Sequence, residues 1–432
     1  MRPESNPRMG VRSLGAFGFA LIVGLTAHTA AAEGPPARDS LDLETALRLT
    51  RERNPGLAAL RLEIEAREAL REQAAKRPNP ELTLDAENFA GSGSFAGADG
   101  METTVGFSQV LETGGKRAAR IEAARADAES ARWDLRAEEA RLSAQVRSAF
   151  AGVLAAQERL RILESGQEVH ERILETAKLR HQAGKAPATE EMKARMAYSL
   201  AHIEIDRAVQ EMRAALIRLG SFWTAEAPSF TAVRGDLRRV RPLPALDSLL
   251  PLLDRHPGLE RWKTEEARRQ ASLRAAKAEG RPDPTFAGGV RHLNDRGSGE
   301  AALVAGVSLP IPLPNRTRGA IREAERRIAK AGMERMAVRA ELTSRLRTLH
   351  QHLLARGEEL AHLKDELLPE ADKTLQASQE AYRLGKLSFL EVLDSQRTLN
   401  DLASRYITSL AEYQDDWHEI QSLTSLGGMP DR

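Results

Sequence analysis

The chain of 432 residues contains two copies of one unit, and this internal repeat limits its possible folds more than any other feature. Four sets of residues recur in the same order, displaced by 200 to 204 residues: Asn54-Pro55-Gly56-Leu57 with His256-Pro257-Gly258-Leu259, Pro78-Asn79-Pro80 with Pro282-Asp283-Pro284, Gly106, Ser108, Ile121 and Ala124 with Gly306, Ser308, Ile321 and Ala324, and Gly184-Lys185 with Gly385-Lys386. A nearly constant spacing indicates repeated structural units. We therefore expect two repeats, at 33–235 and 236–426, and a C-terminal tail at 427–432.

Each repeat is expected to begin with a helical segment that ends at a Pro-x-Pro motif and leads into two short strands. The expected helical segments are 41–76 and 245–279, and the expected strands are 82–89, 103–111, 285–293 and 302–309. Apolar or long side chains alternate along the second strand of each pair, at Val105, Phe107 and Gln109, and at Leu303, Ala305, Val307 and Leu309. Each strand is about long enough to cross a bilayer when tilted.

A very long helix is expected after each pair of strands. No proline occurs between Pro80 and Pro187. Apolar residues recur there at the heptad spacing of a coiled coil, with further apolar positions such as Val146 and Val153 between them: Ile121, Ala128, Leu135, Leu142, Ala149, Ala156 and Leu163. A helix over 116–181 would be a rod of roughly 100 Å.

Both rods are expected to turn and to return as antiparallel helices. The first turns at 184–187 and returns to about Leu219. The second extends over 316–383 with a kink at Pro369, turns at Gly385 and returns to about Leu423.

The composition agrees with helical rods and disagrees with a compact enzyme. Aromatic residues make up only 4% of the chain and charged residues 29%. The formal net charge of +1 gives no reason to expect a nucleic-acid partner. The absence of cysteine excludes disulfides, thiolate metal sites and a lipid anchor on Cys.

The N-terminus is typical of an export signal. Basic residues precede a short apolar run at 14–27, and small residues follow at Ala30 and Ala32. We expect a signal peptide at 1–32 with cleavage before Glu33; an uncleaved membrane anchor is the alternative.

Four strands per chain cannot form a closed structure in a membrane alone. The edges of an open four-stranded sheet would expose unpaired backbone groups to lipid, and single-chain barrels begin at about eight strands. The sequence therefore favours an oligomer that contacts membrane lipid, and two or three copies would supply eight or twelve strands.

Several segments resemble the TolC family of outer-membrane efflux proteins, over essentially the whole chain after the signal. The resemblance is closest to the CzcC-like, heavy-metal branch, and its segments are 79–82, 87–91, 102–104, 108–112, 114–117, 382–388 and 391–394. It implies a mainly α fold with a small transmembrane β part: a long α-helical barrel continuous with a twelve-stranded β-barrel of a homotrimer.

The resemblance also implies a function without catalysis. Such channels lie in the bacterial outer membrane, extend through the periplasm, and dock with a periplasmic adaptor and an inner-membrane RND pump. In the CzcC-like branch the cargo is a divalent cation such as cobalt, zinc or cadmium. No enzyme activity, cofactor or bound metal is expected, because the sequence contains no phosphate-binding loop, nucleophile elbow or zinc-protease motif.

The candidate site residues follow from the resemblance and lie at the two hairpin tips. Glu391 and Asp394 occupy positions at which family members ring the periplasmic aperture, with Tyr382 and Glu190 as further candidates. Carboxylates from several copies would attract cations there. Leu387 stands where some relatives carry a basic residue, which puts the family's aperture salt bridges in doubt.

The tip turns are candidates for the surface that docks the adaptor. They contain Gly184, Lys185, Leu384, Gly385 and Lys386. In a purely structural interpretation, each glycine only supplies the left-handed residue at a helix end.

Three other functions are left open. Within the channel class, the cargo could instead be drugs, organic compounds or secreted protein. A periplasmic adaptor also has a long helical hairpin but normally only one, and an intracellular coiled-coil scaffold would need neither the export signal nor the strands.

Overall fold

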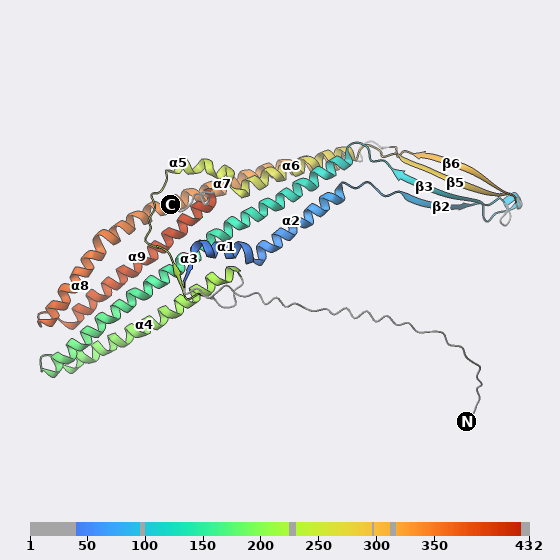
Figure 1. The fold of residues 1–432 in the computed structure, drawn as a ribbon. Coiled ribbons are helices and arrows are strands. Elements are labelled where there is room, and N and C mark those ends of the chain that lie inside the picture. The colour runs from blue at the N-terminus through green and yellow to red at the C-terminus, as the bar shows by residue number, and fades with distance from the viewer. Residues whose placement is uncertain (1–39, 96–99, 224–229, 296–297, 312–316, 425–432) are drawn as a thin grey trace, which may run out of the picture. The chain divides into compact units, whose positions relative to one another are not determined.

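The computed structural model describes residues 40–95, 100–223, 230–295, 298–311 and 317–424. The expected signal peptide at 1–32 and the expected tail at 427–432 lie outside these residues. The order of elements is similar in the two halves of the chain (Figure 1).

The first half contains a short strand, two helices, two strands and a helical hairpin. These elements are β1 (Ser40–Asp42), α1 (Leu43–Arg53), α2 (Pro55–Ala74), β2 (Glu81–Glu87), the 3-10 turn η1 (Gly93–Phe95), β3 (Glu102–Val110), α3 (Lys116–Gln182), α4 (Ala188–Gly220), η2 (Ser221–Trp223) and β4 (Ala232–Arg234). The rod α3 has 67 residues, as expected from its long proline-free sequence.

The second half repeats the order helix, strand, strand, rod, turn and returning helix. It contains α5 (Leu246–Leu249), η3 (Leu250–Arg255), α6 (Pro257–Ala278), β5 (Thr285–Asp295), β6 (Ser298–Ser308), α7 (Arg318–His362), the π-helix η4 (Leu363–Leu367), α8 (Leu368–Arg383) and α9 (Phe389–Thr424). The predicted second rod over 316–383 is therefore a helix with a π-helical segment inside it.

Three predictions about helix continuity were wrong in detail. The segment 41–76 is broken at Asn54, because the proline that follows removes a backbone donor and starts a new helix. The segment 245–279 begins with α5 and η3 before α6. The irregularity expected at Pro369 lies before it, where η4 holds an extra residue in one turn.

The repeated Pro-Gly-Leu motifs mark the start of equivalent helices. The side chain of Asn54 accepts a hydrogen bond from the Leu57 amide at 3.1 Å and caps α2. The imidazole of His256 accepts from the Gly258 amide at 3.1 Å and caps α6. Each side chain satisfies one amide that has no partner within its helix. The side-chain Nδ2 of Asn54 also donates to the Phe222 carbonyl at 2.8 Å, so Asn54 joins α2 to the end of the hairpin.

The helices pack side by side in a defined order. In the part that carries the hairpins, α3 packs against α4 on one side and α9 on the other, and α9 packs against α8. In the part next to the strands, α3 packs between α2 and α6, and α6 contacts α7. Thus α2 and α4 lie at one edge of the layer, and α7 and α8 lie at the other.

The heptad seam of α3 was predicted only approximately. Ala128 and Leu142 are buried, as expected for seam positions. Val146 and Val153, two of the intermediate apolar positions, are however fully buried, whereas Leu135, Ala149, Ala156 and Leu163 are only partly buried. The seam shifts because α3 packs against different helices along its length.

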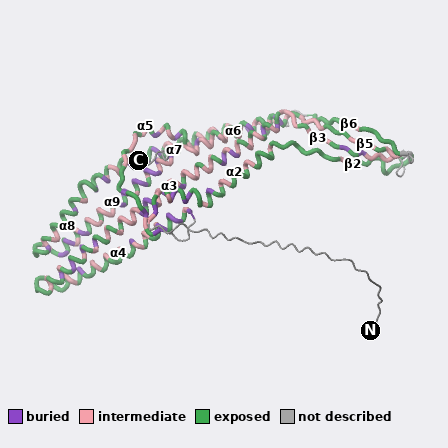
Figure 2. The backbone as a smooth tube through the Cα atoms, in the orientation of Figure 1, coloured by how far each residue is buried: buried purple, intermediate pink, exposed green. Residues whose placement is uncertain are grey.

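The four longer strands form one antiparallel sheet in the order β2-β3-β5-β6. Directly opposite residues share a face of a sheet, and the register therefore forms rows across all four strands. One row is Leu84, Val105, Val290 and Leu303, all of them exposed. The outer strands β2 and β6 are exposed along most of their length (Figure 2).

The opposite face of the sheet is polar. Arg291 on β5 pairs with Glu102 on β3 at 2.5 Å and with Glu87 on β2 at 3.3 Å, and its Nε donates to the Thr104 hydroxyl at 3.0 Å. The sheet is thus apolar on one face and charged on the other. No helix among the described residues is long and apolar enough to cross a membrane.

A second, two-stranded sheet was not predicted. β1 pairs in parallel with β4, from the far end of the first repeat. Leu41 and Val233 lie directly opposite each other and are buried in a core with Phe150 and Trp223. Three-residue strands carry too little alternation to be detected in a sequence.

Candidate functional site

The two hairpin tips have the same turn. Gly184 and Gly385 have φ values of +65° and +73°, a conformation that glycine adopts without steric cost. The amide of Lys185 donates to the Arg180 carbonyl at 2.8 Å, and the amide of Lys386 donates to the Ala381 carbonyl at 2.9 Å. These bonds are typical of a helix that ends at a left-handed glycine. All five candidate docking residues are exposed: Gly184, Lys185, Leu384, Gly385 and Lys386.

A side-chain network joins the two hairpins just above the turns. The Tyr382 hydroxyl on α8 donates to Glu190 Oε1 on α4 at 2.6 Å. Arg180 on α3 donates to the Tyr382 carbonyl at 2.5 Å, and its guanidinium carbon lies 4.7 Å from the centre of the Tyr382 ring. Arg180 Nε also lies 3.7 Å from Glu190 Oε1. The structure therefore brings two candidates, Tyr382 and Glu190, into direct contact.

The protonation of Tyr382 is fixed by its surroundings. Burial raises the pKa of its hydroxyl strongly, and the hydrogen bond to Glu190 raises this pKa further. The hydroxyl therefore stays protonated at any physiological pH and can act as a donor to Glu190.

Glu391 has a structural role at the start of α9. Its carboxylate accepts hydrogen bonds from the Ser388 hydroxyl at 2.6 Å and from the Ser388 amide at 2.9 Å. The hydroxyl of Ser388 lies 3.4 Å from the Glu391 amide, which completes a capping box. These bonds, first from the side chain and then from the backbone of Ser388, lower the pKa of Glu391. Asp394 is exposed one turn further along α9.

The tip network rests on a small apolar core, which we call the tip core. Leu387 packs against it. Its buried members are Val169, Ile173, Leu174, Ala177, Ala194, Leu375, Tyr382, Phe389 and Val392.

Two residues with side-chain contacts at the tips were missed at the sequence level. Arg180 is separated from Tyr382 by 202 residues, so that only the packing of the hairpins reveals their contact. Ser388 could have been found, since Ser388-Phe389-Leu390-Glu391 has the spacing of a capping box.

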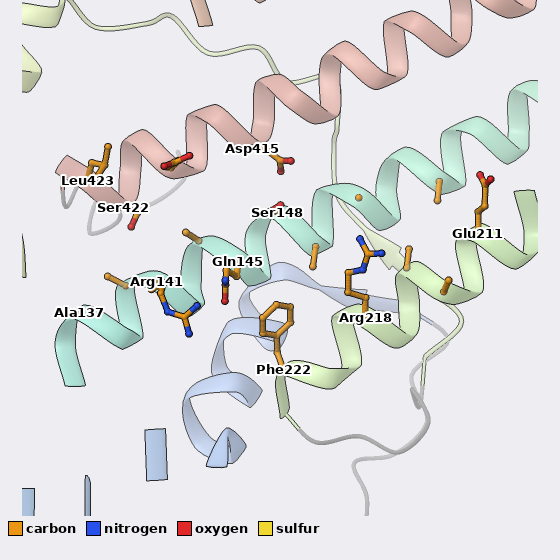
Figure 3. Close-up of a pocket in the computed structure, with 18 of the residues that line it drawn as sticks. Ala137, Arg141, Gln145, Ser148, Glu211, Arg218, Phe222, Asp415, Ser422 and Leu423 are labelled. Atoms are coloured by element: carbon orange, nitrogen blue, oxygen red, sulfur yellow. The ribbon is translucent and has the colours of Figure 1, made fainter. Parts of the chain in front are cut away.

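A large open cavity lies on α3, away from the tips. It has a volume of about 1240 Å³ and lies between α4 and α9 (Figure 3). Its floor on α3 consists of small residues that include Ala144, Ser148 and Gly152. Asp415 on α9 extends toward Ser148, and burial raises the pKa of this carboxyl. The alanine-rich surface of α3 thus borders a cavity here.

No histidine, aspartate or glutamate cluster of metal-binding size occurs within the described part of the chain.

The sequence matches the family of outer membrane efflux proteins over residues 46–224 and 251–426. The chain belongs to this family. The chain is accordingly an outer membrane efflux protein. The two matched segments each contain one hairpin and one pair of the longer strands.

Two curated relatives and one solved structure illustrate what this outer membrane efflux protein is similar to. The chain is 31% identical to the cobalt-zinc-cadmium resistance protein CzcC of Cupriavidus metallidurans, over 87% of this chain and 88% of that protein. It is 26% identical to the nickel-cobalt-cadmium resistance protein NccC of Alcaligenes xylosoxydans xylosoxydans, over 78% and 75%. The crystal structure of the Campylobacter jejuni CmeC outer membrane channel matches with a TM-score of 0.71 and 13% identity, over 90% of this chain and 87% of that one. The last match shows a shared fold.

Proposed function

We propose that this protein is the channel subunit of a three-part efflux system that exports divalent heavy-metal cations. In this proposal it forms a homotrimer, docks with a periplasmic adaptor that connects it to an inner-membrane RND pump, and acts as a passive conduit without catalysis. The helices form a periplasmic tunnel, and the strands of three copies form one twelve-stranded barrel in the outer membrane. The chain consists of two repeats, at 33–235 and 236–426.

The observation that carries the proposal is that the chain has two open edges, and that these edges consist of different elements. In the sheet, the open edges are the outer strands β2 and β6. At the helices, α2 and α4 form one edge and α7 and α8 the other, and Figure 1 shows α2 and α4 on the side of β2. An edge that cannot pair with itself but can pair with the opposite edge of another copy generates a ring. Such a ring also satisfies the unpaired backbone groups of β2 and β6, as a membrane requires.

The exposed side chains of α4 support this assembly. Met192, Met196, Leu200 and Ile203 form an apolar stripe along α4, each about 60% exposed. The other face of α4 packs on α3. On the opposite edge of the chain, Met333, Met336 and Leu367 are exposed. A neighbouring copy would cover both apolar surfaces.

The different polarity of the two faces of the sheet supports a barrel that spans the membrane, with its apolar face toward lipid. The exposed apolar row of Leu84, Val105, Val290 and Leu303 is suited to lipid. The opposite face, with Arg291 between Glu87 and Glu102, is suited to a water-filled interior.

The choice of cargo rests on the relatives CzcC and NccC, whose names state resistance to cobalt, zinc, nickel and cadmium. We assign the periplasmic aperture to Glu391, Asp394, Tyr382 and Glu190. Because Glu391 is engaged with Ser388, Asp394 is the more available of the two α9 carboxylates. The hydrogen bond from Tyr382 to Glu190 would hold the two hairpins together when the aperture is closed. The exposed tip turns would dock the adaptor.

The test is deletion of the gene in its host, with growth measured across zinc, cadmium, cobalt, nickel and copper. Drugs and detergents serve as controls, and the intact gene is restored on a plasmid. Sensitivity restricted to one or more metals, reversed by the plasmid, is the expected result. Sensitivity to organic compounds alone would keep the channel and replace the cargo, and normal growth on every metal would contradict the proposal.

A further inference from the structure

The cavity of about 1240 Å³ on α3 leaves one side of a central helix uncovered, and we call it the alanine groove. Seven alanines line it, five on α3 and two on α4, and the C-terminal parts of α4 and α9 form its walls. Another side of α3 at the same level is covered, because Val146 and Val153 are fully buried there. The groove is therefore a local gap in the cover of α3.

The alanine groove combines an apolar floor with a polar rim. Phe222 and Leu423 add larger apolar side chains to the alanines, and charged side chains such as Arg141, Arg218 and Glu419 surround them. A hollow apolar surface with a polar rim is typical of a place where another segment binds. The occupant should therefore carry apolar side chains in the middle and a charge toward the rim.

The helix α9 ends at this groove. Its last residue is Thr424, and Figure 3 shows Ser422 and Leu423 near the Ala137 end of the floor. Residues 425–432 follow in the sequence and lie outside the described residues. Eight extended residues reach up to about 28 Å. The floor from Ala137 to Ala156 is also about 28 Å long, so this segment is long enough to cover most of it.

The sequence of this segment fits a return into the groove. Because α9 runs toward the Ala137 end, the chain has to reverse its direction to lie along the floor. Gly427 and Gly428 make such a reversal possible, since glycine adopts the backbone conformations of tight turns without steric cost. Leu426 and Met429, on either side of the two glycines, are apolar side chains that match the alanine floor.

One wall of the groove offers a matching charge. Arg218 on α4 extends toward α3 in Figure 3, and its guanidinium forms no ion pair with any residue that the structure describes. Asp431 is the only acidic residue in 425–432, and it follows Met429 by two positions. A segment that enters from α9 and places Met429 on the floor brings Asp431 toward the α4 wall.

From the end of α9, the uncovered floor and the charge of Arg218, we propose that residues 425–432 fold back into the alanine groove of their own chain. Leu426 and Met429 cover the floor, and Asp431 pairs with Arg218. The docked segment bridges α9 and α4 across α3 and so connects the two hairpins at the ends far from their tips. The proposal is independent of the channel function, because it concerns contacts within one chain.

The test uses the absence of cysteine from the chain, which makes an introduced thiol unique. Ala144→Cys places a thiol on the groove floor, and Ser143→Cys places one on the next residue, which does not line the groove. Both positions are half-buried. The rate of maleimide labelling of each thiol is measured in the detergent-purified full chain and in the same chain with Leu426→Ser/Met429→Ser. Leu426→Val/Met429→Leu, which keeps both side chains apolar, is the matched control.

The thiol of Ala144→Cys should label about tenfold more slowly with the wild-type segment than with the serine variant. This ratio corresponds to a segment that is docked in about nine-tenths of the molecules. The control segment should protect as the wild type does, and the thiol of Ser143→Cys should label at one rate in all three backgrounds. Equal rates at Ala144→Cys, or faster labelling of both thiols in the serine variant, would overturn the proposal.

A disulfide identifies the chain that supplies the segment. In Ala144→Cys/Met429→Cys, mild oxidation should join the two residues within one chain, since a disulfide forms only when the two Cα atoms come within about 7 Å. Ser143→Cys/Met429→Cys should not form this bond. A disulfide between two chains would assign the groove to a neighbouring copy, and failure to form any disulfide would remove Met429 from the floor. Either result would contradict the proposal.

Discussion

At the scale of single residues, contact between the two hairpin tips depends on one hydroxyl group. Tyr382 packs its ring in the tip core and donates from its hydroxyl to Glu190 on the other hairpin. The family resemblance was enough to select both residues as candidates. It did not predict Arg180, whose contact with Tyr382 joins residues 202 positions apart and depends on how the hairpins pack.

Tyr382→Phe is expected to favour the open aperture. Phenylalanine keeps the apolar packing and removes the bond to Glu190, which leaves that carboxylate with the more distant Arg180. We expect a higher open fraction in planar bilayers and unchanged oligomeric mass. Phe389→Leu, which alters the same core but no hydrogen bond, is the control. Equal open fractions in wild type and Tyr382→Phe would show that this bond does not hold the aperture.

A second residue-scale prediction concerns His418 on α9. Its side chain is 8% exposed, and burial lowers its pKa from 6.5 to about 3, with a smaller effect of Arg147 and Arg241. Between about pH 6.5 and pH 3, His418 therefore binds a proton in the unfolded chain but not in the folded chain. The free energy of unfolding decreases as the pH is lowered through this window. At pH 5 the loss from His418 is about 2 kcal/mol per chain.

The His418→Gln variant should lose less stability between pH 7 and pH 5 than the wild-type protein. Melting followed by circular dichroism at both pH values measures the difference. Burial raises the pKa values of the nearby Asp415 and Asp416, which act in the opposite direction, but they are present in both proteins and do not affect the comparison. An identical pH dependence in both proteins would mean that His418 is accessible to protons in the folded state.

At the scale of elements, the tip turns are defined by their backbone conformation. The sequence was sufficient to predict both turns, because glycine at the end of a long apolar repeat is a strong helix-stop signal. The rods were also predictable, from the absence of proline. The π-helix η4 was not predicted, because the segment Leu363–Leu367 contains no proline or glycine that would mark an irregular turn.

Substitutions at Gly385 should separate turn geometry from docking. At φ +73°, valine is strained, whereas asparagine tolerates this conformation. We expect Gly385→Val to abolish metal resistance while the oligomer forms normally, and Gly385→Asn to retain most of the resistance. Full resistance in the valine variant would remove this turn from the docking surface.

At the scale of the whole molecule, the main feature is that its two edges are different. The sequence predicted an oligomer from the strand number alone. It could not assign helices to edges, because that assignment depends on which surfaces of α3 and α9 are already occupied by neighbouring helices. The exposed stripe on α4 is therefore a property of the packed hairpins and only indirectly of the heptad pattern.

Charges placed on the α4 stripe should prevent assembly. The Met196→Glu/Leu200→Glu variant adds two negative charges to a surface that a neighbouring copy would bury, and an unpaired buried charge is costly. We expect monomers by light scattering in detergent. Lys193→Glu, at another exposed position of the same helix, changes the net charge by the same amount and should leave the oligomer intact. Assembly of the stripe variant as in wild type would place the interface elsewhere.

The rod of the first repeat, α3, and the rod of the second repeat, which consists of α7, η4 and α8, are nearly equal in length. Their length sets the distance from the strands to the tip turns. One is a single helix of 67 residues, and the other consists of contiguous segments of 45, 5 and 16 residues. Both tip turns therefore end at about the same depth, and each heptad contributes about 10 Å to this depth. Removing a heptad from one rod alone would leave the two tips at unequal depths. A change in the spacing between two membranes would have to be matched by paired changes in both rods, so the lengths of the two repeats are constrained to change together.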